Sequence, residues 1–352
     1  MKRARRVWTA RTAGALLLSV GILLGAPAGE AAPIVVKLAT VAPEGSLWHL
    51  ITKDMAERWR EASDGQVVVR IFPGGIAGDE TDVIRKIRIG QLQAAAVTSG
   101  ALHDIGPAAM ALMIPMLYDS YEELDYVRER LAVDLETRMA ERGFVVLSWG
   151  DAGWIRFFAQ KPVVRPDDLR SRKLFVWAGD STALDLYRRA GMNAVPLAVT
   201  DVLPGLQTGL IDAFDTTPLA ALAFQWFAKA PHMTDLKWAP LVGATVIHRP
   251  TWERIPPGLR PALMTAAREA AAARQEEIRR LDQEAIAEMR KYDLRVVPVP
   301  PEAHAQWQAS AEGVYPVIRG KLVPAEYFDR AVRLRDEYRR NRLAEDHRAG
   351  QQ

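Results

Sequence analysis

The stretch from Gly153 to Pro218 decides the fold that the sequence predicts. It begins Gly-Trp-Ile-Arg-Phe-Phe at residues 153–158, passes through Lys-Leu-Phe-Val-Trp at 173–177, and ends with Asp-Thr-Thr-Pro at 215–218. Short apolar runs alternate here with an amphipathic stretch, which indicates strands that alternate with a helix. The strand ends carry polar or aromatic side chains that a core does not require. Because ligands of open α/β sheets bind beyond the carboxyl ends of strands, we interpret this stretch as one wall of a ligand cleft.

The segments on both sides of this stretch predict an α/β fold with right-handed crossovers. Upstream, strands are predicted at 34–40, 67–72, 94–98 and 145–149, with helices that begin after Ser46 and Asp79 and a further helix at 121–142. Downstream, we predict a helix at 219–227, strands at 235–238, 242–248 and 294–299, a long helix from 257 or 258 to about 292, and closing helices at 302–318 and 324–340. The long helix is of a length that suits a connection between two lobes.

The N-terminus has the pattern of a secretory signal peptide. Lys2, Arg3, Arg5, Arg6 and Arg11 precede an apolar run at 13–24 and a small-residue pattern at 26–28. The run is short for a membrane span, so we assign 1–32 to a signal peptide and expect a soluble, periplasmic mature protein. A single membrane anchor is the alternative, and a twin-arginine export route is also open.

Composition excludes several classes of function. The chain has 352 residues, which is enough for two domains, and no cysteine, so disulfides, thiolate catalysis and cysteine-ligated zinc are excluded. Residues 1–32 carry a charge of +4 against +3 for the whole chain, which leaves the mature part at −1 and gives no basis for a nucleic-acid partner. The six histidines have no metal-ligand spacing, and no nucleophile elbow, phosphate loop or dinucleotide fingerprint occurs. We therefore expect no catalytic residue, no metal and no cofactor.

Several short strings, taken in order, resemble the solute receptors of TRAP (tripartite ATP-independent periplasmic) transporters, the DctP family. The strings are Phe-Pro-Gly-Gly at 72–75 with Gly-Asp-Glu at 78–80, Pro-Asp-Asp-Leu-Arg at 166–170 with Lys-Leu-Phe-Val at 173–176, and Leu-Gln-Thr-Gly-Leu-Ile-Asp at 206–212. The resemblance covers roughly residues 37–339. It implies a two-lobed, type II-like periplasmic-binding-protein fold that closes over a small organic acid and delivers it to a permease of a small and a large membrane subunit, driven by an ion gradient.

The resemblance also implies domain bounds. Lobe I would hold 33–152 and 241–280, lobe II would hold 153–240 and 281–340, and 341–352 would be a frayed tail. Two other functions stay open on the sequence alone. One is a secreted hydrolase-like enzyme that acts in the same cleft, and the other is a ligand-sensing subunit of a periplasmic signalling system.

One position departs from the family pattern. Relatives typically place an arginine at the position of Phe175, where it grips the ligand carboxylate with two parallel hydrogen bonds. Arg156 is therefore our candidate anion anchor, beside Trp154 on the same predicted strand. An arginine on an apolar strand must pair or face water, so a structural salt bridge with Asp151 or Asp168 is the alternative.

The remaining candidate ligand contacts lie at strand ends. Phe175 and Trp177 share one face of a strand and are either a cleft wall for a hydrophobic or ring-bearing ligand or ordinary core. Asp215, Thr216 and Thr217 offer oxygens to a ligand or, for Asp215, to a bridging cation, and the threonines are alternatively part of a capped turn before Pro218. The family resemblance adds three more candidates, namely Thr98, Trp48 and Trp238. Packing between the lobes is the alternative role for Trp48, and a position in the hinge is the alternative for Trp238.

Overall fold

The computed structural model describes residues 32–178 and 181–349, so the predicted signal peptide up to residue 31 lies outside the described residues. The strands are β1 (Ile34–Thr40), β2 (Val67–Phe72), β3 (Ala94–Val97), β4 (Phe144–Ala159), β5 (Lys173–Trp177), β6 (Asn193–Leu197), β7 (Ala213–Thr216), β8 (His232–Thr234), β9 (Ala239–His248) and β10 (Arg295–Val297). The helices of eight or more residues are α1 (Leu47–Ala62), α2 (Glu80–Arg88), α4 (Tyr121–Glu141), α6 (Ser181–Arg189), α7 (Val199–Thr208), α10 (Arg260–Arg290), α11 (Pro301–Val317) and α12 (Ala325–Ala349). Shorter ones are α3 (Ser99–Ile105), η1 (Pro107–Met113), α5 (Pro166–Arg170), α8 (Pro218–Ala223), η2 (Trp226–Ala228), α9 (Arg249–Arg254) and η3 (Ile318–Leu322). Within these residues, no helix combines the length and apolar character that a membrane crossing requires.

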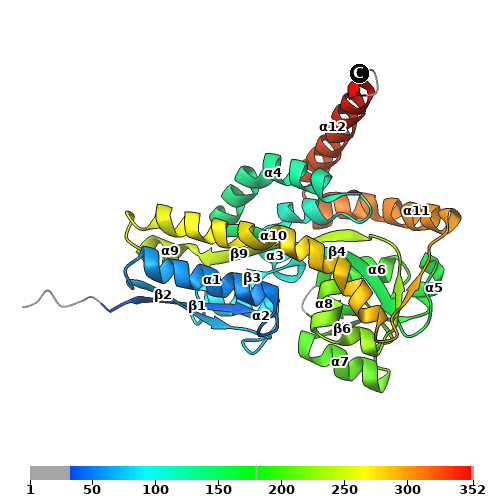
Figure 1. Cartoon of the computed structure of the whole chain (residues 1–352), viewed down its shortest axis with the longest axis horizontal. Coiled ribbons are helices and arrows are strands. Elements are labelled where there is room, and N and C mark those ends of the chain that lie inside the picture. The colour runs from blue at the N-terminus through cyan, green and yellow to red at the C-terminus, as the bar shows by residue number, and fades with distance from the viewer. Residues whose placement is uncertain (1–31, 179–180, 350–352) are drawn as a thin grey trace, which may run out of the picture. The chain divides into compact units, whose positions relative to one another are not determined.

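The strands form a mixed sheet in the order β2-β1-β3-β9-β4-β7-β5-β6 (Figure 1). The strand β1 is parallel to β2 and β3, and β5 is parallel to β6 and β7. Between these two parallel groups, β9 and β4 run antiparallel to their neighbours. Helices connect the parallel strands, as βαβ units require. This arrangement confirms the α/β fold class that the sequence predicts.

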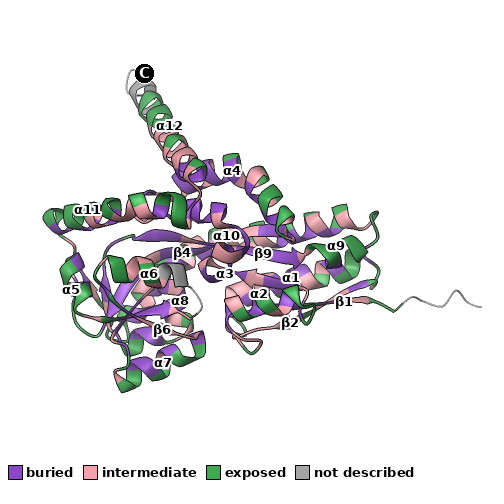
Figure 2. Cartoon of the chain, turned by 180° about the vertical axis from the view of Figure 1, so that it is seen from behind, coloured by how far each residue is buried: buried purple, intermediate pink, exposed green. Residues whose placement is uncertain are grey.

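The strand β4 belongs to both parts of the sheet. It pairs with β9 from Phe144 to Ile155, and it pairs with β7 from Arg156 to Ala159. The sequence predicted a strand at 145–149 that leads into a further apolar strand within 153–158. The structure instead continues as one strand and absorbs the irregularity as a register shift between Asp151 and Gly153. Figure 2 shows β4 and β9 largely buried.

The long helix α10 connects the two predicted lobes, close to the bounds expected from the sequence. At its N-terminal end it packs on α1, where the buried indole of Trp59 donates a hydrogen bond to the carbonyl of Leu263 at 2.8 Å. At its C-terminal end the buried carboxyl of Asp282 accepts hydrogen bonds from the backbone N–H groups of Trp154 at 3.2 Å and Leu219 at 3.1 Å. One helix therefore contacts α1 near its N-terminal end and both β4 and α8 near its C-terminal end.

Two other predictions differ from the structure. The strand predicted at 235–238 is displaced, because β8 covers His232–Thr234 and pairs there with β10 and β4. The closing helix α12 was expected to end at Arg340, yet it continues to Ala349, since residues 341–349 are mostly good helix formers. The two methionines of η1, Met110 and Met113, are buried in the largest core cluster.

Candidate functional site

A cavity of about 130 Å³ lies where four strands place their carboxyl ends. Thr40 ends β1, Thr98 follows β3, Trp177 ends β5 and Thr216 ends β7. The middle of β4, the strand β9 and one face of α10 complete the wall. The lining residues are Thr40, Val41, Ala42, Trp48, Ile51, Thr52, Glu80, Ala96, Val97, Thr98, Ser148, Trp149, Gly150, Asp151, Ala152, Trp177, Thr216, Ala220, Leu241, Gly243, Ala244, Thr245, Ala271, Gln275 and Ile278. Both predicted lobes contribute to this set.

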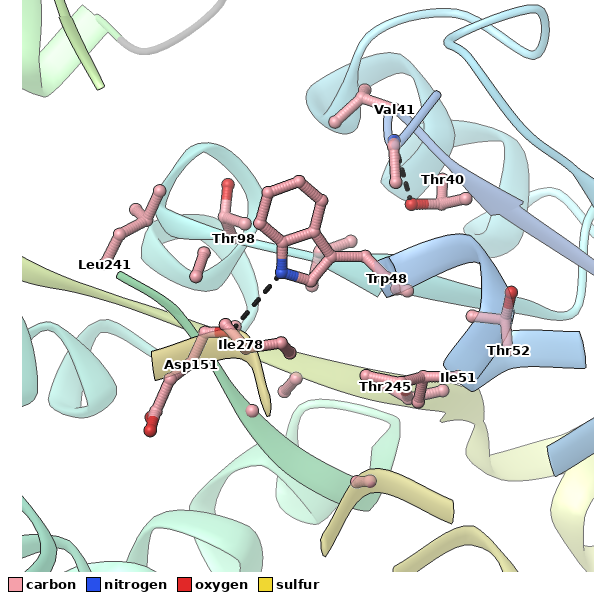
Figure 3. Close-up of a pocket in the computed structure, with 18 of the residues that line it drawn as sticks. Thr40, Val41, Trp48, Ile51, Thr52, Thr98, Asp151, Leu241, Thr245 and Ile278 are labelled. Carbon is pink, nitrogen blue, oxygen red and sulfur yellow. Dashed lines mark hydrogen bonds between the residues drawn. The ribbon is translucent and has the colours of Figure 1, made fainter. Parts of the chain in front are cut away.

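Three tryptophans are among the residues that line the cavity. Trp48 comes from the first turn of α1, which Ser46 caps, and its indole N–H points to the carbonyl oxygen of Asp151 at 3.4 Å (Figure 3). The indole N–H of Trp149 donates a hydrogen bond to the carboxylate of Glu136 at 3.0 Å, which fixes its position. Trp177 contacts the edge of the Phe175 ring, with ring centroids 5.2 Å apart. Aromatic faces held in this way suit an apolar or ring-bearing ligand.

Glu80 is the most perturbed acid of the cavity wall. It begins α2, and its carboxylate accepts hydrogen bonds from the N–H of Thr98 at 2.8 Å, the hydroxyl of Thr98 at 3.0 Å and the N–H of Ala101 at 3.0 Å. Burial raises the pKa of Glu80 to about 7, although these hydrogen bonds act in the opposite direction. Glu80 thereby fixes the position of Thr98 at the cavity.

This burial predicts a pH dependence of stability. Because the pKa of Glu80 is raised in the folded chain, the folded state binds more protons than the unfolded state between about pH 4.5 and 7. The free energy of unfolding should therefore fall as the pH rises through this window. Burial also raises the pKa of Asp79, Asp215 and Asp282, each to about 6. These three acids therefore also lower the free energy of unfolding as the pH rises. Urea unfolding at pH 5 and pH 7.5 should give a smaller difference for Glu80→Gln than for the natural chain, and an unchanged difference would contradict this assignment.

A buried charge cluster supports the floor of the cavity. The side chain of Asp151 is fully buried, and its two carboxylate oxygens each lie 2.6 Å from an arginine, one from Arg128 and the other from Arg279. Both arginines also bind Asp125, at 2.6 and 2.7 Å. Gln275 donates to Asp151 at 3.3 Å. The cluster joins α4, β4 and α10 directly behind the cavity wall.

The structure brings together four of the ten residues that the sequence singled out as ligand contacts. Trp48, Thr98, Trp177 and Thr216 line the cavity. Thr217 does not, because its hydroxyl caps α8 by accepting from Ala220 N–H at 3.3 Å, which is the capped turn named as the alternative. Ligand contact by any of these residues stays a prediction.

Asp215 and Phe175 also lie outside the lining. The carboxylate of Asp215 accepts a hydrogen bond from Tyr187 at 2.8 Å. Phe175 is fully buried and packs edge-on against Trp226, with centroids 5.9 Å apart. The side of β5 that carries Phe175 is thus covered by core, and only Trp177, two residues further along, reaches the cavity.

The other three residues cluster around the C-terminal half of β4, away from the lining. Arg156 donates to Asp235 at 2.7 Å, so the structural salt bridge exists, with Asp235 in place of Asp151 or Asp168. Trp154 packs on Tyr121, with ring centroids 5.4 Å apart. Trp238 packs on Phe157 at 5.4 Å.

Sequence reasoning missed part of the wall, namely Glu80, Trp149, Asp151, Gln275 and Ile278. The sequence held a sign that two of these residues belong to the site. Glu80 stands in one of the family strings, and Trp149 ends a predicted strand, where ligand contacts are expected. The residues of α10 carried none, because nothing in a uniformly helical composition shows which face meets a cavity. Over the described residues, no group of three or more His, Cys, Asp or Glu is placed to hold a metal ion.

Comparison with known proteins finds relatives of this chain. A solute-binding protein of Roseobacter denitrificans, RD1_1052, is 27% identical over 276 residues, which cover 76% of this chain and 82% of the relative. The C4-dicarboxylate-binding periplasmic protein DctP of Rhodobacter capsulatus is 25% identical, with 74% of this chain and 79% of the relative covered.

Solved structures show the same fold. A TRAP periplasmic solute-binding protein from Shewanella oneidensis with bound succinate matches with a TM-score of 0.80 at 19% identity, over 86% of this chain and all of that one. One from Xanthobacter autotrophicus Py2 with bound β-D-galacturonate has a TM-score of 0.79 at 20% identity, over 86% and 99% of the two chains. The family described as bacterial extracellular solute-binding protein, family 7 (DctP), matches residues 38–320. The chain therefore belongs to this family of extracellular solute receptors, as the strings at 72–80, 166–176 and 206–212 predict.

Proposed function

We propose that this chain is the periplasmic receptor of a TRAP-type secondary transporter. It would be exported by its N-terminal segment, bind a small organic acid without changing it chemically, and deliver it to the small and large permease subunits. One observation carries the proposal: the carboxyl ends of β1, β3, β5 and β7, from both predicted lobes, meet at one cavity. Relatives of the same fold hold succinate or galacturonate, which supports an organic acid as the solute.

The proposed lobes would close on the solute by a hinge. Lobe I would comprise 33–152 and 241–280, and lobe II 153–240 and 281–340. The chain segments that cross between them are β4, the start of β9 and α10, and these are the elements in which a closing motion would bend. The register shift between Asp151 and Gly153 lies at one of these crossings, beside the cavity wall.

Binding without chemistry is directly testable. The mature protein is incubated with a panel of organic acids, and its melting temperature is measured with each. A solute present at about 100 times its Kd should stabilise the protein by about 2.7 kcal/mol. Mass spectrometry of the released ligand should then recover the same molecule that was added. Turnover of the bound acid by purified protein would contradict the receptor function and favour an enzyme.

A further inference from the structure

The residues that line the cavity carry no positive charge. Among the lining residues that the structure describes, none is arginine, lysine or histidine. A carboxylate that enters such a site loses water and gains no charged hydrogen-bond partner in return. Neutral groups, such as the hydroxyls of Thr216 and Thr245, are the side-chain donors that the wall offers to an anionic part of the solute.

Arginines of the adjoining elements are engaged with carboxylates. Arg128 and Arg279 share Asp125 and Asp151, with each nitrogen–oxygen distance at 2.6 or 2.7 Å. Arg156 is held by Asp235. Moving one of the first two into the cavity would strip a buried acid of a partner, which is strongly unfavourable.

Two acids of the wall already use the donors that surround them. Glu80 accepts three hydrogen bonds, and the carboxylate of Asp151 is fully buried beside its two arginines. Because these donors are engaged, a carboxylate placed deep in the cavity would gain no hydrogen-bond partner from them. The depth of the cavity therefore suits an uncharged group.

The apolar part of the wall has the size for a ring. Trp48, Trp149 and Trp177 line the cavity together with aliphatic residues such as Leu241 and Ile278. The cavity measures about 130 Å³. An apolar cavity of about 150 Å³ in a protein core holds benzene, so a six-membered ring is of the right order of size.

Resting on the proposed receptor function, we propose that the cavity recognises its solute through an uncharged apolar body of about ring size. The acid that this receptor binds is then an aromatic or alicyclic monocarboxylate. Dicarboxylates and sugar acids, which relatives of this fold hold, are poor ligands here, because they would bring a second charge or several hydroxyls against tryptophan and aliphatic side chains.

Calorimetric titration of the mature protein tests this selectivity. Phenylacetate and cyclohexanecarboxylate should bind at least tenfold more tightly than succinate and galacturonate. Phenylacetamide, which has the ring without the charge, should also bind. The proposal is overturned if succinate or galacturonate binds as tightly as the ring acids, if phenylacetate binds and phenylacetamide does not, or if no ring-bearing probe binds. If the amide binds and no acid does, the apolar recognition stands and the organic-acid part of the proposed function fails.

Three substitutions test where the solute binds. Trp177→Ala should weaken phenylacetate binding about tenfold or more, because Trp177 forms part of the apolar wall. Tyr292→Ala is the matched control, since this aromatic side chain is 63% exposed and outside the cavity, and its affinity should be unchanged. Arg156→Ala separates this proposal from an arginine anchor. Loss of phenylacetate binding in a variant with a native circular dichroism spectrum would overturn the proposal, and retained binding supports it.

Discussion

Replacing Asp151 by alanine is expected to lower the free energy of unfolding by about 3–5 kcal/mol. The substitution leaves Arg128 and Arg279 with Asp125 as their remaining acid in the cluster. Arg279 cannot escape by losing its proton. Burial lowers the pKa of Arg279, but its hydrogen bonds and charge interactions with Asp125 and Asp151 hold that pKa above the ordinary arginine range. One positive charge would therefore remain in a largely buried site without an acid to balance it.

Urea unfolding monitored by circular dichroism measures this loss, and Asp54→Ala is the control. Asp54 pairs with Arg58 on the surface of α1 at 3.1 Å, and about a third of each side chain is exposed, so its removal should cost less than about 1 kcal/mol. A loss for Asp151→Ala as small as that of the control would show that the cluster does not stabilise the fold. Asp151 also lines the cavity, so the surviving folded fraction should bind solute more weakly.

Much of the fold follows from local patterns in the sequence. The apolar runs of β1, β2 and β3, with the capping residues Ser46 and Asp79 between them, predict the first βαβαβ segment to within a few residues. The long helix α10 follows from its alanine, arginine, glutamate and leucine content. These elements are determined by short-range chemistry, which a single sequence shows directly.

The continuous strand β4 could not be predicted in the same way. Gly150 and Gly153 flank Asp151 and Ala152, and glycine and aspartate in such a short segment ordinarily mark a turn. What keeps the chain extended is its partner: β9 pairs with both sides of the irregularity, from more than 80 residues away. Long-range pairing therefore overrides the local preference.

The site residues at strand ends could be predicted from the sequence. The contacts between elements that lie far apart in the sequence could not. Trp177 and Thr216 could be found because each ends a strand of the sheet. Phe175 could not be told from a wall residue, since both faces of β5 are apolar, and Trp226, which covers it, lies 51 positions later. Asp151 was named as a possible ion-pair partner of Arg156, but its actual partners could not be foreseen, because they come from α4 and α10.

Gly153→Ala is expected to destabilise the chain by about 3 kcal/mol or more, through two effects that add. Gly153 has a φ of +112°, a region that residues with a side chain rarely adopt. A Cβ at this position would also stand 2.5 Å from Cγ and Oδ1 of Asp282, well inside van der Waals contact.

Asp282 cannot move away without further loss. It is fully buried, and its carboxyl oxygens hold the N–H groups of Trp154 on β4 and Leu219 on α8. Displacing it would leave two buried donors unsatisfied, at about 1–3 kcal/mol for each group. The close approach of backbone to carboxyl at Gly153 is thus what allows α10 to contact β4 and α8 together.

Gly258→Ala separates this effect from a general intolerance of glycine substitution. A Cβ added at Gly258 would meet no atom within 4 Å, and its φ is an ordinary one, so this replacement should change the free energy of unfolding by no more than about 0.5 kcal/mol. If Gly153→Ala were equally mild, Asp282 would have room to move, and the contact between α10 and β4 would not depend on this glycine. Because Asp151, Ala152 and Ile278 line the cavity on either side of the contact, the folded Gly153→Ala protein should also lose affinity for its solute.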